Sequence, residues 1–337
     1  MSRRPRIALV LGDPAGIGPE LVARLLAAPS TLTRADVVIV GDREELAEGA
    51  RIAGVTVESD VTTDRTALRP RAGRPALYDY RGAALSPFVR AAVSANGGRY
   101  ALDTLTAAID LTCTGATDAL CFAPLNKASL HEAGLTHEDE GQWFAERLGV
   151  PGHSGELNVL GGLMTSRVTS HVAIKDVAGL ITEERVVGAI RLVYDTLVSM
   201  GIVKPRIAVC GLNPHAGESG NFGREEIDVI APAIQRSVDA GRPALGPFPA
   251  DTVFLKAADL DAVVTMYHDQ GQIAMKLMGF SRGVTFYGGL PIPIATPAHG
   301  TSFDIYGQGR ANPGAILAAF DLLCRVVASR IATAGPQ

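Results

Sequence analysis

Short runs of apolar and β-branched residues alternate along the chain with longer segments whose apolar residues recur every three or four positions. The first pattern predicts buried strands and the second predicts amphipathic helices. Strands are expected at residues 6–11, 36–40, 119–123, 168–174, 206–210, 262–266, 284–287 and 292–295. Helices are expected at residues 19–28, 43–53, 99–113, 140–148, 183–200, 225–240, 272–277 and 313–328. This alternation predicts an α/β fold with a largely parallel sheet.

Several of the predicted strands end directly in polar turn sequences. These are LVLGDPAGIG, LCFAPLNK, HVAIKD, AVCGLNPHAGE and TMYHDQG. Ligands of open α/β sheets bind outside the carboxyl ends of the strands, so these turns are the first candidates for a site. Residues 58–98 are instead rich in Arg, Pro and Gly, and they are expected to form irregular structure or short edge strands.

Composition narrows the function further. The chain has 337 residues, of which 47% are hydrophobic and 20% charged, which suggests roughly two domains with large cores. A net charge of −4 and only 5% aromatic residues argue against nucleic-acid binding. The four cysteines form no CxxC pair and lie in apolar segments, as buried reduced thiols do. Because no apolar run suits a signal peptide or a membrane span, a cytoplasmic protein without membrane contact is expected.

Three of the seven histidines, His171, His215 and His268, lie at predicted strand ends with a carboxylate shortly after each. Three imidazoles that leave one position open suit a catalytic divalent metal, and nearby carboxylates could orient the rings. The alternative is that each is an ordinary strand-end histidine with its own hydrogen-bond partner.

Two glycine-rich segments are candidates for phosphate or nucleotide binding. GDPAGIGPE lacks the third glycine of the dinucleotide fingerprint, so it predicts a turn that presents a helix N-terminus to an anion. HGTSFDIYGQGRANPGA joins a strand to a helix with Asn312 as its N-cap. Within it, His299, Thr301 and Asp304 could hold an adenosine group, or the segment could be a long structural turn.

Six ordered motifs resemble the 4-hydroxythreonine-4-phosphate dehydrogenase family of pyridoxine biosynthesis. They are GDPAGIGPE, APLNKASLHEAG, GLNPHAGESGNFGREEIDVIAPAI, PADTVF, YHDQGQIAMKLMGF and HGTSFDIYGQG, and together they extend over nearly the whole chain. The resemblance implies the two-lobed isocitrate/isopropylmalate dehydrogenase fold, with mostly parallel sheets and a cleft between the lobes. Residues 1–125 with 285–337 would form the cofactor lobe. Residues 126–284 would form the metal, substrate and dimerisation lobe of a homodimer with a shared active site.

The resemblance also implies roles for particular residues. The metal, with zinc foremost and manganese, cobalt or magnesium as alternatives, would be bound by His171, His215 and His268. NAD or NADP would be bound by His299, Gly300, Thr301, Asp304 and Asn312. Lys276 matches a substrate-binding lysine and is the candidate for proton transfer. Asp251 and Asp269 could orient ligands or relay protons, although Asp251 could equally cap the following helix. Asn126 and Lys127 lie at another strand end and could reach the cleft, although Lys127 could equally be solvated.

The sequence departs from the family pattern at predicted substrate contacts. Glu140, Gly141, Thr285 and Ile294 stand where the family has His, Thr, Asn and Arg. Losing Arg and His weakens the case for a phosphorylated substrate, because a dianion needs fixed donors and positive charge. Threonate, a related sugar acid or a cyclic dihydrodiol acid are therefore alternative substrates.

The implied reaction is metal-assisted oxidation of a secondary alcohol in a hydroxy acid, with hydride passing to the nicotinamide. Decarboxylation would follow if the product were a 3-oxo acid. A zinc hydrolase using the same histidines is a second hypothesis, and it predicts activity without NAD. A third is a non-catalytic homologue that binds metal or nucleotide without turnover.

Overall fold

The computed structural model describes residues 3–80, 87–150, 152 and 154–334. The chain forms two compact units. Unit 1 comprises Met1–Leu148, Val284–Phe286 and Leu290–Gln337, and unit 2 comprises Gly149–Gly283 and Tyr287–Gly289. The first boundary therefore lies later than the expected one after Leu125. The reason is that the segment beyond Leu125 packs on unit 1, where Leu130 and Leu135 form a buried cluster with Ala101.

Unit 1 is built on a mostly parallel sheet with the strand order β3-β4-β2-β1-β5-β12-β11. Among the pairings that the structure describes between named strands of this unit, only that of β11 with β12 is antiparallel. The strands are β1 Arg6–Val10, β2 Asp36–Gly41, β3 Asp60–Thr62, β4 Ala76–Asp79, β5 Ala119–Phe122, β11 Val284–Gly288 and β12 Ile294–Pro297. β5 and β12 are buried along their whole length, as expected for parallel strands with helices on both faces.

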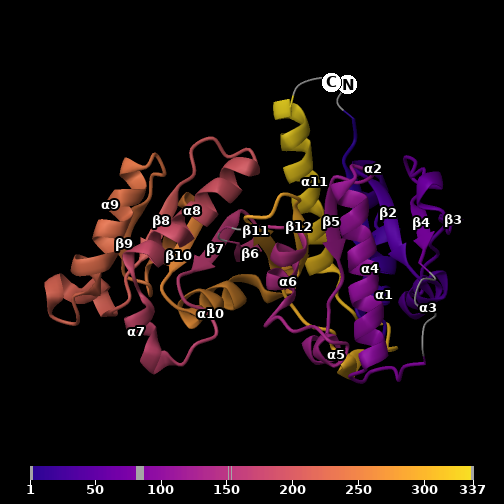
Figure 1. The fold of residues 1–337 in the computed structure, drawn as a ribbon, viewed down its shortest axis with the longest axis horizontal. Helices are drawn as coiled ribbons and strands as arrows, with labels where there is room; N and C mark the ends of the chain where they lie inside the picture. Colours follow the sequence, from indigo (N-terminus) through magenta and orange to yellow (C-terminus); the bar gives the residue numbers. More distant parts are fainter. Residues whose placement is uncertain (1–2, 81–86, 151, 153, 335–337) are drawn as a thin grey trace. The chain divides into compact units, whose positions relative to one another are not determined.

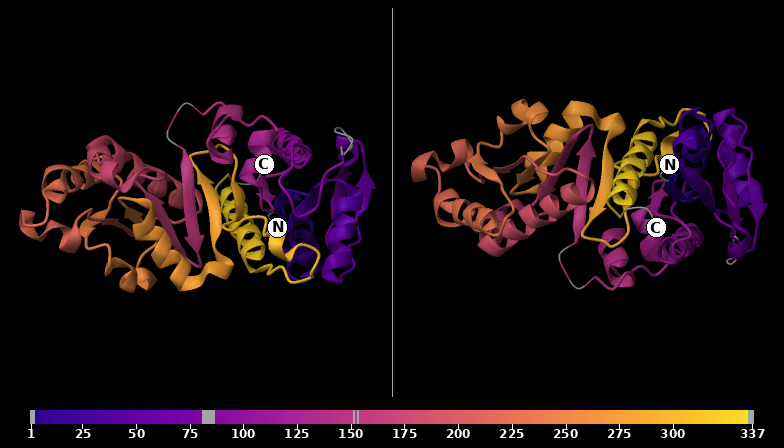
Figure 2. Two further views of the ribbon diagram at one scale, coloured as in Figure 1. Left: turned by 90° about the horizontal axis from the view of Figure 1, so that it is seen from below. Right: turned by 90° about the horizontal axis from the view of Figure 1, so that it is seen from above.

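The helices of unit 1 cover both faces of this sheet. They are α1 Gly18–Ala27, α2 Thr31–Arg34, α3 Arg43–Ala53, α4 Ala95–Cys113, α5 Lys127–Glu132, α6 Glu140–Arg147 and α11 Gly314–Ala334. Figures 1 and 2 show the magenta α4 on one side of the sheet and the indigo α1 and yellow α11 on the other. Local sequence sets the helix ends: the Asp42 side chain caps α3 by accepting from the Glu44 N–H, and Gly54 ends α3 at φ +67°.

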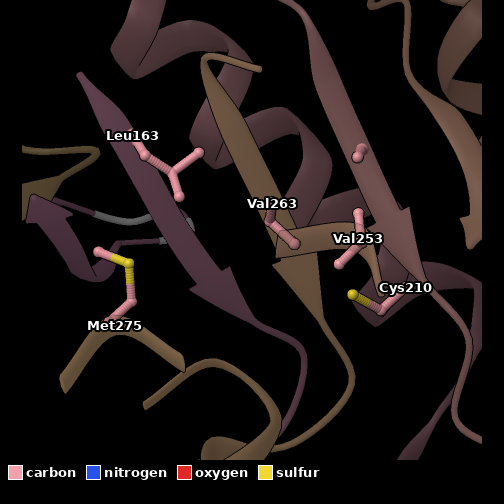
Figure 3. Packing of buried hydrophobic residues seen from close by; sticks show 6 residues of the cluster. Leu163, Cys210, Val253, Val263 and Met275 are labelled. Atoms are coloured by element: carbon pink, nitrogen blue, oxygen red, sulfur yellow. The ribbon is translucent and has the colours of Figure 1, made fainter. Parts of the chain in front are cut away.

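The strands of unit 2 are mostly parallel and follow the order β6-β7-β10-β8-β9. Its strands are β6 Gly155–Leu160, β7 Leu163–Arg167, β8 Ile207–Cys210, β9 Leu245–Phe248 and β10 Ala262–Thr265. Its helices are α7 Val177–Leu180, α8 Glu183–Ser199, α9 Ala231–Asp239 and α10 His268–Gly279, together with a π-helical turn at Glu226–Ile230. Figure 3 shows part of the core, where Leu163, Val263 and Cys210 of three strands lie near Val253 of the 3₁₀ helix Val253–Asp259 and Met275 of α10.

The prediction of an α/β fold with mostly parallel strands is confirmed. The predicted strand at residues 168–174 is wrong, because the strand lies earlier, at Leu163–Arg167, and pairs antiparallel with β6. The predicted helix at residues 272–277 begins earlier, at His268. In the region predicted to be irregular, β3 is an edge strand, whereas β4 lies between β3 and β2.

Two further expectations concern cysteines and membranes. Cys121, Cys210 and Cys324 are buried free thiols, but Cys113 is exposed because it lies at the last turn of α4. Within the described ranges, no helix is both long and apolar enough to cross a membrane.

Candidate functional site

The three histidines singled out from the sequence all lie in unit 2, beyond the carboxyl ends of neighbouring strands. His171 follows β7, His268 is the first residue of α10 after β10, and His215 lies in the turn after β8. Because β10 lies between β7 and β8 in the sheet, the parallel strands deliver these segments to one edge.

Hydrogen bonds join the three segments around the end of β10. The backbone N–H and the hydroxyl of Thr169 donate to the carbonyl of Met266, at 3.0 and 2.8 Å. The Gln270 side chain accepts from the Met266 N–H at 2.8 Å and donates to the Gly211 carbonyl at 3.1 Å. Thr169 and Gln270 thus connect the His171 and His215 segments to the strand end that carries His268.

His171 and His268 form a pair of imidazoles with ring centres 5.8 Å apart. Two imidazoles bound to one ion, at a metal–nitrogen distance of about 2.1 Å, have ring centres roughly 5–6 Å apart. The Nδ1 atom of His268 lies 2.7 Å from Oδ1 of Asp269, which fixes the ring and leaves Nε2 for a ligand. The pair therefore has the spacing of two ligands of one metal.

His215, the third predicted ligand, does not lie with this pair. The ring of His215 lies 6.2 Å from that of Phe222, at the exposed side of its turn. Among the described residues, no three His, Cys, Asp or Glu side chains form a group that could hold one metal ion. The structure thus brings together two of the three predicted ligands, with the third on a segment hydrogen-bonded to them through Gln270.

Lys276 and Asp251 are both exposed. Lys276 lies on α10 and shares one face of the helix with His268 and Gln272, at spacings of four residues. Asp251 precedes the 3₁₀ helix Val253–Asp259, whose N-cap is Thr252, so Asp251 does not cap it.

A polar network beside the histidines was not foreseen from the sequence. The Arg167 side chain is 11% exposed, and its guanidinium donates to Ser170 at 2.8 Å, to Asn158 at 3.0 Å and to Glu156 at 3.2 Å. Gln272 also donates to Asn158. The network supports the start of the His171 segment against α10.

In unit 1, the turns after β1 and β5 meet the loop after β12. The Asp13 N–H donates to the Pro124 carbonyl and the Ile17 N–H donates to the Thr301 carbonyl, at 3.0 and 3.1 Å. Asn126 Nδ2 lies 3.5 Å from Thr301 Oγ1, while its Oδ1 caps α5 by accepting from the Ser129 N–H at 2.9 Å. The structure therefore brings together two residues predicted for substrate and cofactor.

Asp13 is a buried carboxyl at this meeting point. It is 1% exposed, and its Oδ1 accepts from the Ala15 N–H at 2.8 Å. Burial raises the pKa of Asp13, and the Ala15 N–H partly offsets that rise. The carboxyl stabilises the glycine-rich turn that lies against Thr301.

The remaining predicted cofactor residues lie along the loop before α11. His299 is half-buried, with Nδ1 3.1 Å from the Gly300 carbonyl, and Gly300 and Asp304 are exposed. Asn312 accepts from the Gly314 N–H at 2.8 Å, so its side chain acts at the start of α11 as expected for an N-cap. Lys127, at the start of α5, is exposed.

The four positions that depart from the family pattern are largely covered. Glu140 and Gly141 begin α6, where Glu140 is 9% exposed. Thr285 is 8% exposed in β11, and Ile294 is fully buried in β12, where it pairs with Leu120 of β5. Ile294 is therefore part of the unit 1 core.

Comparison with known proteins assigns most of the chain to the family that its motifs resemble. A family model described as "Pyridoxal phosphate biosynthetic protein PdxA" matches residues 33–323. A Pseudomonas aeruginosa protein named "Putative 4-hydroxythreonine-4-phosphate dehydrogenase 2" is 57% identical over 96% of this chain and 97% of its own. A "Putative D-threonate 4-phosphate dehydrogenase" of Bradyrhizobium diazoefficiens is 39% identical over 97% of this chain and 98% of its own.

Solved structures support membership of the same family. The crystal structure of 4-hydroxythreonine-4-phosphate dehydrogenase from Klebsiella pneumoniae has a TM-score of 0.84 and 32% identity. That comparison covers 97% of this chain and 98% of the other. The chain thus belongs to the PdxA family and is a dehydrogenase.

Proposed function

We propose that this dehydrogenase oxidises the secondary alcohol of a hydroxy acid, using NAD or NADP and a divalent metal bound by His171, His215 and His268. The observation that carries the metal assignment is the imidazole pair of His171 and His268, with ring centres 5.8 Å apart. Neutral imidazoles suit zinc first, and manganese, cobalt or magnesium are alternatives. A metal there would polarise the substrate hydroxyl and stabilise the developing ketone oxygen.

The residues of the chain supply the other parts of the reaction. Asp269 holds the His268 ring through Nδ1, and Lys276 on the same face of α10 is proposed to bind the substrate carboxylate or accept its hydroxyl proton. Asn126, Thr301 and the His299–Asp304 loop are proposed to hold the dinucleotide. Decarboxylation would follow oxidation if the ketone lies β to a carboxylate.

For the substrate, the names of the relatives favour 4-hydroxythreonine 4-phosphate or D-threonate 4-phosphate. Glu140 and Ile294 argue for an unphosphorylated hydroxy acid, because they place a buried carboxyl and a core side chain where the family has His and Arg. Membership of a dehydrogenase family disfavours the zinc hydrolase hypothesis.

We further propose that a second copy of the chain covers the histidine segments, as in a homodimer with a shared site. Exposed apolar side chains flank all three segments: Ile174 is 70% exposed, Phe222 53%, Ile273 58% and Leu277 84%. Exposed apolar side chains that gather in one patch mark protein–protein interfaces. Light scattering after gel filtration should give twice the mass of one chain, and Leu277→Asp should yield monomers.

Metal content and substrate range test the proposal. Metal bound per chain, measured by mass spectrometry after dialysis, should approach one in the wild type and fall in His171→Ala and His268→Ala. Initial NADH or NADPH formation should then be compared for the two phosphorylated candidates, D-threonate and a dihydrodiol acid. Full metal binding by both variants would refute the ligand assignment, whereas the rates identify the substrate.

A further inference from the structure

A cluster of polar side chains lies at the carboxyl end of β7 in unit 2. Arg167 ends β7, Asn158 lies on the neighbouring strand β6, and Ser170 follows in the segment after β7. All three residues are half-buried, and the Arg167 side chain is 11% exposed. Gln272 on α10 donates to Asn158, so the cluster is closed on one side by the helix.

The oxygen atoms of Asn158 and Ser170 are used within the cluster, but their hydrogens are not. Asn158 Oδ1 accepts from Arg167 at 3.0 Å and also from Gln272, while Ser170 Oγ accepts from Arg167 Nε at 2.8 Å. Within the described part of the chain, no acceptor is found for the Asn158 amide N–H groups or the Ser170 hydroxyl. Two of the five N–H groups of Arg167 are also unused. These spare donors require an acceptor.

The charge of the cluster limits which acceptor it suits. Glu156 Oε2 lies 3.2 Å from Arg167 Nη2, so the two charges largely offset each other. A carboxylate, with one negative charge and two acceptor oxygens, matches a set of several donors around one arginine. A phosphate group with two negative charges would be repelled more strongly by the Glu156 carboxylate. The cluster is therefore better suited to a carboxylate than to a phosphate group.

The cluster lies beside the imidazole pair of the proposed active site. Ser170 directly precedes His171, and Gln272 follows His268 by one helical turn. Both histidines and the end of β7 lie at the same edge of the sheet. A small hydroxy acid bound at this edge would bring its acidic group within the region where the spare donors lie.

We infer that Arg167, Asn158 and Ser170 bind the carboxylate of the hydroxy-acid substrate. This inference rests on the proposed function and deepens it, because it assigns a specificity-determining residue, Arg167, to the substrate's acidic group. Lys276 is then left to accept the proton of the substrate hydroxyl.

The test measures binding of a carboxylate to full-length protein kept free of metal by a chelator. D-threonate is the first probe and inorganic phosphate the second, both titrated by calorimetry. The variants are Arg167→Lys and Glu156→Gln, and Arg206→Lys is the matched control. Arg206 also pairs with a carboxylate at 3.2 Å, that of Asp261, but it directly precedes β8 and so lies at the opposite edge of the sheet.

The two variants should move the affinity in opposite directions. Arg167→Lys should bind D-threonate about tenfold more weakly, because lysine keeps the charge but lacks the planar fork of donors. Glu156→Gln keeps an oxygen for Arg167 and removes the negative charge, so D-threonate should bind about threefold to tenfold more tightly, and phosphate should gain more. Arg206→Lys should match the wild type. A merely structural network predicts a lower unfolding midpoint for Glu156→Gln and no gain in affinity.

Steady-state kinetics give a second readout. With a hydroxy acid that the wild type oxidises, Arg167→Lys should raise KM about tenfold and leave kcat nearly unchanged, because the substrate carboxylate is bound alike in the ground state and the transition state. A fall in kcat with unchanged KM would instead contradict a role in binding the carboxylate.

The outcomes separate the inference from the proposed function. If wild-type protein shows no saturable binding of D-threonate, or if Arg167→Lys binds it as tightly as Arg206→Lys does, the inference is overturned while the proposed function stands. If none of the hydroxy acids reduces NAD or NADP, the proposed function fails, whereas the titrations still decide whether the cluster binds a carboxylate. Should Arg167→Lys not fold, Glu156→Gln decides, and an unchanged or weaker affinity would overturn the inference.

Discussion

Replacing Gly16 with alanine should disturb the loop at residues 299–304, which is proposed to hold the dinucleotide, through one added methyl group. Gly16 lies in the turn after β1, where the Ile17 N–H donates to the Thr301 carbonyl at 3.1 Å. A Cβ atom at Gly16 would lie 2.7 Å from Thr301 Cβ and 2.9 Å from its carbonyl oxygen. Since Thr301 is only 6% exposed, it cannot simply turn into solvent.

The size of the effect follows from these distances. Carbon atoms in contact are normally about 3.5–4.0 Å apart, so Thr301 must withdraw by roughly 1 Å. Overpacking of this kind costs about 1–3 kcal/mol, and each kcal/mol lowers the midpoint of a domain of this size by about 2–4 °C. A fall of about 2–12 °C is expected. Loss of one hydrogen bond at the displaced loop, worth about 1–1.5 kcal/mol, would weaken NAD or NADP binding about five- to tenfold.

Thermal unfolding followed by circular dichroism and dinucleotide titration by calorimetry measure the two effects separately. Gly179→Ala is the matched control, because nothing lies within 4 Å of the added methyl group on α7 and its stability should be equal or slightly higher. A Gly16→Ala protein with wild-type midpoint would refute the packing of Gly16 on Thr301. A lowered midpoint with unchanged dinucleotide affinity would instead remove this loop from the cofactor site.

Three further outcomes follow from the structure. At pH 8 only Cys113 should react rapidly with a thiol reagent in the folded protein, because the other cysteines are buried. Rapid modification of two or more cysteines per chain would contradict this. Burial alone would raise the pKa of Asp118, but hydrogen bonds from Arg3 and Arg6 outweigh it and hold that pKa below its ordinary value. Asp118→Asn should therefore lower the free energy of unfolding by about 1–2 kcal/mol at pH 7. The difference in unfolding free energy between the two proteins should shrink as pH falls below about 4 toward the lowered pKa, because protonation of Asp118 removes its stabilising contribution from the wild type as well. Denaturant unfolding curves that give the same difference at every pH would disprove this. Lys276→Ala should reduce kcat by about 10²–10⁴ if Lys276 transfers the proton, and a change confined to KM would assign it to binding alone.

Much of the fold could be predicted because its central strands are continuous apolar runs. β1, β5 and β10 lie within about one residue of their predicted limits, since buried parallel strands combine apolar and β-branched residues. β7 was misplaced because Leu163–Arg167 carries Thr, Ser and Arg, whereas the following VTSHVAI looks more strand-like. The Gly161-Gly162 turn between β6 and β7, with Gly161 at φ +61°, was the overlooked signal for a hairpin.

The candidate site could be predicted only in its outline. Strand ends and the family resemblance indicated His171, His215 and His268, and the fold places them beyond three neighbouring strands. The hydrogen bonds of the Gln270 and Glu226 side chains could not be predicted, because their partners are backbone groups of another segment. Every residue has such backbone groups, so the sequence does not indicate which ones a side chain contacts. Nor does sequence spacing indicate that the His215 turn is left-handed, since Ala216, Glu218 and Ser219 are ordinary residues.

The most direct test of the account is the initial rate of NADH or NADPH formation from the active hydroxy acid before chelation, after chelation and after zinc is restored. The account predicts that chelation abolishes the rate, that zinc restores it in the wild type, and that zinc fails to restore it in His268→Ala. A rate that survives complete metal removal, or one that zinc restores equally in His268→Ala, would contradict a metal-dependent dehydrogenase built on these histidines.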